Sequence, residues 1–285
     1  MAHRRSRSPL EPPGFQLCCA RFSGSERLGL MQSLFLLAAL SALWAGEQGS
    51  PAATAYRPQI NIPASESLSY TAEWRLIHAG NARLQWNAAG SGWKTGLELE
   101  TVGLVSRLYK VNNEYSSQLN GALCAGSSLM KTNEGSKRRE TSVKFDSERR
   151  KATYVERDLV RNTVADSHEL DIGPCEHDIV GALYRLRAMN VPPGESVQIP
   201  ISDGKKAVMA RVDAQERETI KIGGAGYNTI RYEAHLFNGV LYRRRGRLFV
   251  WLTDDARRLP VQIKVRLPFY IGTVTLQLNQ EGNKK

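Results

Sequence analysis

The stretch RGRLFVWLTDDARRLPVQIKV, residues 245–265, decides the fold. On both sides of its polar centre every second residue is apolar, which is the period of a β-strand with one buried face. These alternating residues are Leu248, Val250 and Leu252 before the centre and Leu259, Val261, Ile263 and Val265 after it. The pattern predicts two antiparallel strands joined by a turn at TDDARR.

The turn TDDARR places two carboxylates, Asp254 and Asp255, beside Arg257 and Arg258. A catalytic acid–base pair must face one reacting group, whereas adjacent residues need not point the same way. Asp and Thr side chains at a turn can hydrogen-bond their own backbone. We therefore expect Thr253 and these four residues to fix the turn, with ion pairs between aspartates and arginines, rather than to form an active site.

The two-residue period extends over most of the chain from about residue 65. LSYTAEWRLI (68–77) is followed by a turn-like His78-Ala79-Gly80, and Gly, Asn and Asp separate the later segments. Regular strand spacing without a linker predicts a single, mainly β domain over residues 65–281. We expect a large antiparallel sheet that curls toward a barrel and leaves a concave inner face.

One segment, HDIVGALYRLRAMNVPPGE (177–195), departs from the two-residue period. Asp178 is a natural N-cap, and Pro192-Pro193-Gly194 ends the pattern. Three- and four-residue spacing relates the apolar side chains Ile179, Val180, Leu183, Leu186 and Met189. The spacing predicts one amphipathic helix over about 178–190, packed against the sheet or inside it.

The apolar run from Leu34 to Trp44 has the length of a signal-peptide core and is too short for a typical membrane helix. Small residues follow it, so we predict a signal peptide and cleavage region over 31–55. Export would place the protein in the periplasm or outer cell envelope, with no membrane span in the mature chain. Residues 1–30 are either an over-long gene start, with Met31 as the initiator, or an extended, unfolded leader.

Export also bears on Cys124 and Cys175, the two cysteines of the mature chain. An oxidising compartment permits a disulfide, which would stabilise the fold by roughly 3–4 kcal/mol. Two separate buried thiols are the alternative.

The sequence CEHD (175–178) contains metal-ligand residue types. Consecutive residues rarely converge on one ion, however, and no second group has zinc-like spacing. We expect no metal and no other cofactor.

The net charge of +11 lies in the body of the protein, because residues 1–55 hold only five of the 39 basic and three of the 28 acidic residues. Such a balance favours anionic partners. The candidates for a basic rim are Arg138, Arg139, Arg243, Arg244 and Arg245; the alternative is that they are solvated surface residues. Nucleic acid is not an expected partner, because an exported chain lies outside the cytoplasm.

Catalytic signatures such as GxSxG, HExxH, a P-loop or GxGxxG after a strand are missing from the sequence. We expect no catalytic residues, although a hydrolase of envelope polymers stays open because distant residues can meet in space.

A concave sheet with a helix suits a binder of amphipathic or anionic envelope components. A scaffolding partner of an envelope assembly is the second hypothesis. Oligomeric state is open. Candidate cavity residues, with core packing as the alternative, are Trp74, Trp86, Tyr184, Tyr232 and Trp251.

Residues 177–206 and 246–278 resemble a bacterial exported family called domain of unknown function 3108. The shared features are an Asp before an ALYxLR-like helix, a PG turn, an xxDGxK hairpin and WLTDDxRRxPV. The opening LSYTAEWRLIHAGNARLQW (68–86) also fits, so the resemblance covers about 65–280. It implies a barrel-like envelope protein without an established activity. Its shape is similar to that of envelope lipoprotein carriers, which implies lipid or lipoprotein handling.

Overall fold

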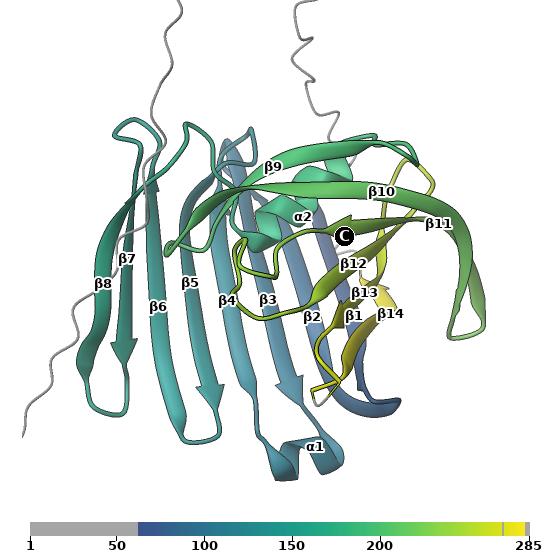
Figure 1. The fold of residues 1–285 in the computed structure, drawn as a ribbon, viewed down its shortest axis with the longest axis horizontal. Coiled ribbons are helices and arrows are strands. Elements are labelled where there is room, and N and C mark those ends of the chain that lie inside the picture. The colour runs from purple at the N-terminus through teal and green to yellow at the C-terminus, as the bar shows by residue number, and fades with distance from the viewer. Residues whose placement is uncertain (1–61, 270, 283–285) are drawn as a thin grey trace, which may run out of the picture. The chain divides into compact units, whose positions relative to one another are not determined.

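Fourteen strands form one curled antiparallel sheet in the computed structural model (Figure 1), which describes residues 62–269 and 271–282. This confirms the predicted fold class. The expected leader (1–30) and signal peptide (31–55) lie outside the described residues. The first eight strands are β1 Ser65–Trp74, β2 Ile77–Ala89, β3 Gly92–Thr101, β4 Asn112–Leu119, β5 Ala125–Glu134, β6 Lys137–Asp146, β7 Lys151–Asp158 and β8 Thr163–Asp171. The remaining six are β9 Ser196–Ser202, β10 Ala207–Ile222, β11 Ala225–Ala234, β12 Arg247–Thr253, β13 Pro260–Arg266 and β14 Thr273–Gly282.

The strands form two meanders that meet at the first and last strand. Their order across the sheet is β8-β7-β6-β5-β4-β3-β2-β1-β14-β13-β12-β11-β10-β9. The first meander therefore joins the second through the pairing of β1 with β14, in which Tyr70 lies opposite Leu278. β8 and β9 are the two edges, and the chain crosses from one to the other through helix α2, Ile179–Ala188.

The inner face of the sheet carries the larger of two apolar cores. Alternation in each strand sends one set of side chains inward, as the two-residue period predicts. From β1 to β7 this set includes Leu68, Tyr70, Leu84, Trp86, Val143, Phe145 and Tyr154. A second core lies between α2 and the strands from β9 to β12, and Leu186, Ile199, Val212, Ile230 and Leu252 belong to it.

Helix α2 lies inside the curve of the sheet (Figure 1), which confirms the helix predicted over about 178–190. Asp178 caps its N-terminus, because Oδ1 accepts hydrogen bonds from Val180 N (2.9 Å) and Gly181 N (2.8 Å). Tyr184 packs into the first core and Leu186 into the second. One helix thus fills part of the interior and joins the two cores.

The first hairpin turns earlier than predicted. β1 and β2 are joined at Arg75-Leu76, and both residues have left-handed backbone angles, with φ of 51° and 68°. The predicted turn at His78-Ala79-Gly80 lies within β2 instead. Gly80 serves there as a point of close approach: a Cβ at this position would lie 2.1 Å from the carbonyl oxygen of Glu100 on β3.

Two further features differ from the prediction. A second helix, α1 (Gly103–Leu108), connects β3 to β4; it has no buried residue and is too short to show an apolar period. In β12 both faces are buried, because Phe249 and Trp251 on the second face are as enclosed as Val250 on the first.

Across residues 62–269 and 271–282, no helix combines the length and apolar character needed to cross a membrane.

Candidate functional site

An apolar cavity of about 340 Å³ lies on the inner face of the sheet, beside the N-terminus of α2. Side chains from β3 to β6, from α2, from the end of β9 and from the loop after β11 surround it. Its apolar wall consists of Leu97, Leu99, Met130, Val143, Ile179 and Val180, and the rings of Tyr115 and Tyr242 complete it. The interior of the curled sheet is therefore partly hollow.

Strand alternation explains why these side chains meet. Leu97 and Leu99 of β3 point inward, while Glu98 between them belongs to the outer face. On β5 the inward residue is Met130. Because β3 to β6 are sequential neighbours in the sheet, their inward side chains form one continuous apolar surface.

Stacked aromatic rings fill the interior beside the cavity. Trp86 of β2 stacks on Tyr184 of α2 with 3.9 Å between ring centroids, and on Trp93 with 4.6 Å. Trp86 and Tyr184 are fully buried (0% exposed) and belong to the core rather than to the cavity wall. The stacked rings of Trp86, Trp93 and Tyr184 form an aromatic plug in the core.

The other three aromatic candidates do not line this cavity either. The Trp74 indole donates to the carbonyl of Ile271 (2.7 Å), and the Trp251 indole donates to Glu218 (2.7 Å). Tyr232 is buried in the second core, where its hydroxyl donates to the carbonyl of Val191 (2.9 Å). Four of the five aromatic candidates are thus buried, and Trp74 is held by the connection that precedes β14.

A cluster of ion pairs borders the cavity where the β9–β10 turn meets β6, β7 and β8. Lys205 of this turn contacts Asp166 (3.1 Å) and Glu156 (3.4 Å), and Glu156 also pairs with Arg139. Partial burial raises the pKa of Glu156, but the Tyr154 hydroxyl, Lys205 and Arg139 together hold it below its ordinary value. The cluster is consequently charged and internally balanced.

The five arginines of the predicted basic rim lie in different parts of the structure. Arg139 is an ion-pair partner in the cluster just described, whereas Arg138 is exposed. Arg243, Arg244 and Arg245 are exposed on the loop that follows Tyr242 of the cavity wall. Lys206 Nζ donates to Gly239 O (3.2 Å), which holds this loop beside the β9–β10 turn. None of the five arginines lines the cavity, but Arg243, Arg244 and Arg245 directly follow Tyr242 of its wall and Arg139 belongs to the ion-pair cluster.

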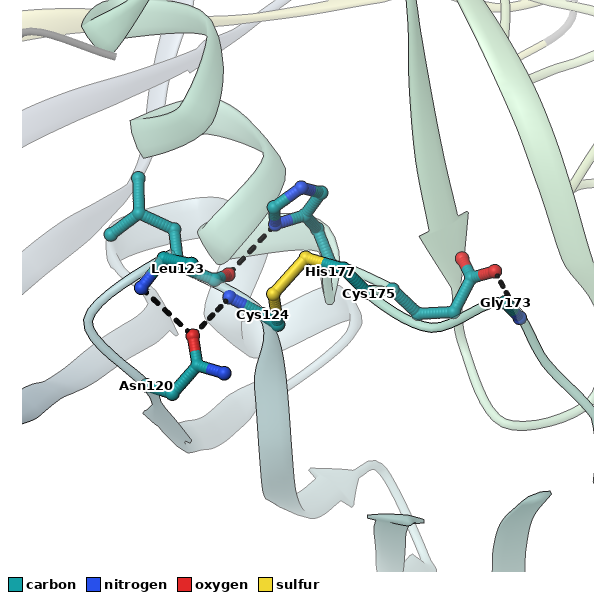
Figure 2. The surroundings of a disulfide bond; sticks show 8 residues. Asn120, Leu123, Cys124, Gly173, Cys175 and His177 are labelled. Atoms are coloured by element: carbon teal, nitrogen blue, oxygen red, sulfur yellow. Dashed lines mark hydrogen bonds between the residues drawn. A yellow bond between two sulfur atoms is a disulfide. The ribbon is translucent and has the colours of Figure 1, made fainter. Parts of the chain in front are cut away.

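A disulfide between Cys124 and Cys175 fixes the segment that leads into α2 (Figure 2). It joins the β4–β5 loop to the chain after β8, across a separation of 51 residues. His177 Nδ1 donates to the carbonyl of Leu123 (2.7 Å), and burial lowers the pKa of His177 to about 4. Because α2 supplies part of the cavity wall, this junction also positions the cavity.

The turn TDDARR has a structural role at the opposite end of α2. Asp255 Oδ1 accepts hydrogen bonds from the Thr253 hydroxyl (2.7 Å) and from the amides of Arg257 (3.0 Å) and Arg258 (3.1 Å). Asp254 pairs with Arg217 of β10, at 2.7 Å. The Arg258 side chain donates to the Tyr232 hydroxyl (2.6 Å), whereas Arg257 lies 3.7 Å from Asp255.

A buried arginine links this turn to the helix and to β1. Arg187 donates to both oxygens of Glu66, at 2.6 and 2.9 Å, and to the backbone carbonyls of Arg257 and Arg258. The Tyr184 hydroxyl donates to the same carboxylate (3.2 Å). The ALYRLR helix and the WLTDDARR turn are thus parts of one buried network that sequence reasoning treated separately.

Polar residues also line the cavity, among them Asn113, Glu114, Ser128 and Asp203. His235 Nε2 lies 2.8 Å from Asp213 on the exposed surface, and the buried His177 donates to a backbone carbonyl. In the part of the chain that the structure describes, no group of three or more His, Cys, Asp or Glu residues could hold a metal ion. The apolar part of the wall is suited to enclosing an apolar group.

The fold and cavity define a barrel-like antiparallel β protein. The chain belongs to the family described as protein of unknown function (DUF3108), whose model matches residues 69–279. No curated protein matches the sequence.

Among solved structures, the chain is similar to the crystal structure of a beta-barrel-like protein of domain of unknown function DUF1849 from Brucella abortus. The TM-score is 0.53 at 8% sequence identity, and the match covers 79% of this chain and 99% of that one. At so low an identity the likeness concerns the fold alone.

Proposed function

We propose that this protein is an exported, non-enzymatic envelope protein that binds or carries an amphipathic component, a lipid or the lipid part of a lipoprotein. The observation that carries the proposal is the apolar cavity on the inner face of the sheet. Its volume of about 340 Å³ falls near the lower end of the range for ligand pockets, roughly 300–1,000 Å³. This size suits a single acyl chain.

The surroundings of the cavity support an amphipathic rather than a wholly apolar ligand. The apolar wall would hold the acyl part, where contact with Leu97, Met130 and Val143 removes it from water. Arg243, Arg244 and Arg245, on the loop after Tyr242, would face an anionic headgroup. The disulfide is consistent with an oxidising compartment and therefore supports export.

The test is whether lipid accompanies the protein and depends on the cavity. We expect protein purified from the periplasm of its own cell to release lipid on extraction and to show bound lipid in native mass spectrometry. Met130→Trp would fill the cavity, while Leu129→Trp places the same ring on the opposite face of β5, because adjacent strand residues alternate. Met130→Trp should lose the lipid and Leu129→Trp should keep it.

Two outcomes would overturn the proposal. One is protein that carries no lipid when purified under mild conditions. The other is equal lipid content in both tryptophan variants, which would place the lipid elsewhere on the molecule. A thermal melt of each variant separates loss of lipid from loss of the fold.

A further inference from the structure

Exposed apolar side chains gather at one end of the sheet. Because the strands alternate in direction, the connections after β1, β3, β7 and β13 all emerge at the end where α1 lies, at the bottom of Figure 1. We call these connections the loop end. Of the eleven large apolar side chains exposed in the described residues, nine lie in or next to it: Leu76, Ile77, Leu104, Leu108, Tyr109, Leu159, Val160, Val164 and Phe269.

The most exposed of these side chains lie on neighbouring connections. Leu76 is 94% exposed and Phe269 is 96% exposed. Their connections touch, because Arg75 Nη2 donates to the carbonyl of Phe269 (3.2 Å) and Trp74 Nε1 donates to that of Ile271 (2.7 Å). Helix α1, with Leu104 and Leu108, is tied to the start of β2 by the hydrogen bond from Val102 N to Ala79 O (2.9 Å).

The stability of the fold does not explain why bulky apolar residues occupy these exposed positions. A two-residue hairpin with left-handed angles at both positions favours Asn-Gly, because bulky side chains are strained there. Arg75 and Leu76 occupy such a turn, and the Leu76 side chain gains no burial in return. A strained, apolar and fully exposed turn indicates a contact outside the chain.

Basic residues surround the apolar tips. The loop end includes Arg75, Arg107, Lys110, Arg161 and Arg266, against Glu73, Glu100, Asp158 and Glu134, the last of which accepts a hydrogen bond from the Tyr109 hydroxyl. The Asp158 carboxylate accepts hydrogen bonds from the amides of Val160 and Arg161, which fixes it within its own turn. The local charge is therefore positive, and it favours an anionic surface.

We propose that the loop end docks on an anionic membrane surface, with Leu76, Leu104, Leu108 and Phe269 inserted at the boundary between headgroups and acyl chains. Apolar tips on separate connections match a flat lipid surface, and nearby arginines and lysines add attraction to acidic headgroups. This surface goes beyond the proposed function and does not depend on what the cavity holds.

The test is vesicle binding by the compact unit that begins at Ala55, which contains every described strand and both cores. Binding is measured by co-sedimentation with vesicles of phosphatidylglycerol and phosphatidylcholine in equal parts, and with phosphatidylcholine alone. We expect binding to the acidic vesicles that weakens as salt is added. Leu76→Asn and Phe269→Ser should each lower the partition coefficient roughly tenfold, the loss expected for one apolar side chain withdrawn from lipid.

Matched controls make the result specific. Met209 is 59% exposed on β10 and belongs to none of the loop-end connections, so Met209→Gln should bind vesicles like the unmodified protein. Leu76→Asn should fold normally, because Asn tolerates left-handed angles. The proposal is overturned if the unmodified unit does not bind acidic vesicles or if the loop-end variants bind undiminished. It is also overturned if these variants abolish self-association in light scattering while vesicle binding persists. Failure here leaves the Met130→Trp test of the cavity unaffected.

Discussion

His177 lies between the disulfide and the first turn of α2, and its ring is buried (2% exposed). Burial lowers the pKa of His177 from its ordinary 6.5 to about 4, so the ring is neutral in the native protein at pH 7. The unfolded chain binds the proton more readily between these two values. Stability that is fully present above about pH 6.5 should therefore be lost as pH falls toward 4, by up to about 3 kcal/mol.

This pH dependence can be measured by urea denaturation at a series of pH values. His177→Gln should flatten the loss of stability between pH 6.5 and 4. Burial also raises the pKa values of Asp178 and Glu176, and that effect has the opposite slope, because raised carboxyl pKa values favour the fold at lower pH. The comparison of variant with unmodified protein isolates the histidine. Parallel curves would contradict the prediction.

Arg187 and Glu66 form an ion pair within the core, and removal of one partner leaves the other charge buried. Glu66→Gln or Arg187→Met should each lower the free energy of unfolding by about 3–5 kcal/mol. The double variant Glu66→Gln/Arg187→Met should lose less than the sum, because no uncompensated charge remains. Additive losses in chemical denaturation would show that the two side chains act independently.

At the scale of elements, the disulfide anchors the start of α2 to the β4–β5 loop. Replacement of both cysteines by alanine should lower the free energy of unfolding by about 4 kcal/mol, because the bridge restricts a loop of about 51 residues in the unfolded chain. The unmodified protein under reducing conditions should show the same loss. A double variant as stable as the oxidised protein would contradict this account.

The β9–β10 turn gives a sharper test of packing. Gly204 has a φ of 85°, and a Cβ there would lie 2.6 Å from Val143 Cγ2 on β6. Gly224 in the next turn has a φ of 86° with no neighbouring atom within 4 Å. Gly204→Ala should therefore lower the melting temperature well beyond Gly224→Ala, since both carry the same backbone strain. Equal losses of melting temperature in the two variants would show that the contact of the β9–β10 turn with β6 adds no destabilisation.

Sequence periodicity predicted elements well where side chains decide their conformation. Alternation located the strands, and Asp178 with Pro192 bounded α2, because each signal lies within a few residues. Helix α1 and the turn at Arg75-Leu76 escaped prediction because local signals are missing: six residues of which none is buried carry no apolar period, and a leucine is a poor indicator of a left-handed turn. Gly80 suggested a turn, but glycine is needed at this position because the backbone of β3 approaches too closely to leave room for a Cβ.

The cavity could not be located from sequence, because its wall combines residues from elements up to 145 positions apart, from Leu97 to Tyr242. Four of the five aromatic candidates are buried, but the sequence did not indicate which interior surface each one joins. Trp86 and Tyr184 form the plug rather than the wall, since α2 brings their rings together. The charged cluster around Lys205 likewise depends on the β9–β10 turn reaching β7 and β8.

At the scale of the whole sheet, the pairing of β1 with β14 holds the two meanders together. Amides at this junction open only when the sheet separates, whereas β8 has a neighbour on one side only. Hydrogen exchange should therefore be slowest in β1 and its neighbours and faster by orders of magnitude in β8. Comparison under conditions that keep the protein folded provides the measurement, and equal protection across the sheet would contradict it.

The unclosed sheet has a consequence for aggregation. The free edge of β9 is met by the backbone of His177, which exchanges hydrogen bonds with Pro200 and Ser202. The edge of β8 has no such cover in the described chain, but it carries Asp166, Glu169 and Asp171 within nine residues. Strand addition along β8 would have to bury these charged side chains, of which Asp166 pairs with Lys205 and Asp171 with Lys151. A charged edge strand of this kind opposes growth into fibrils by strand addition.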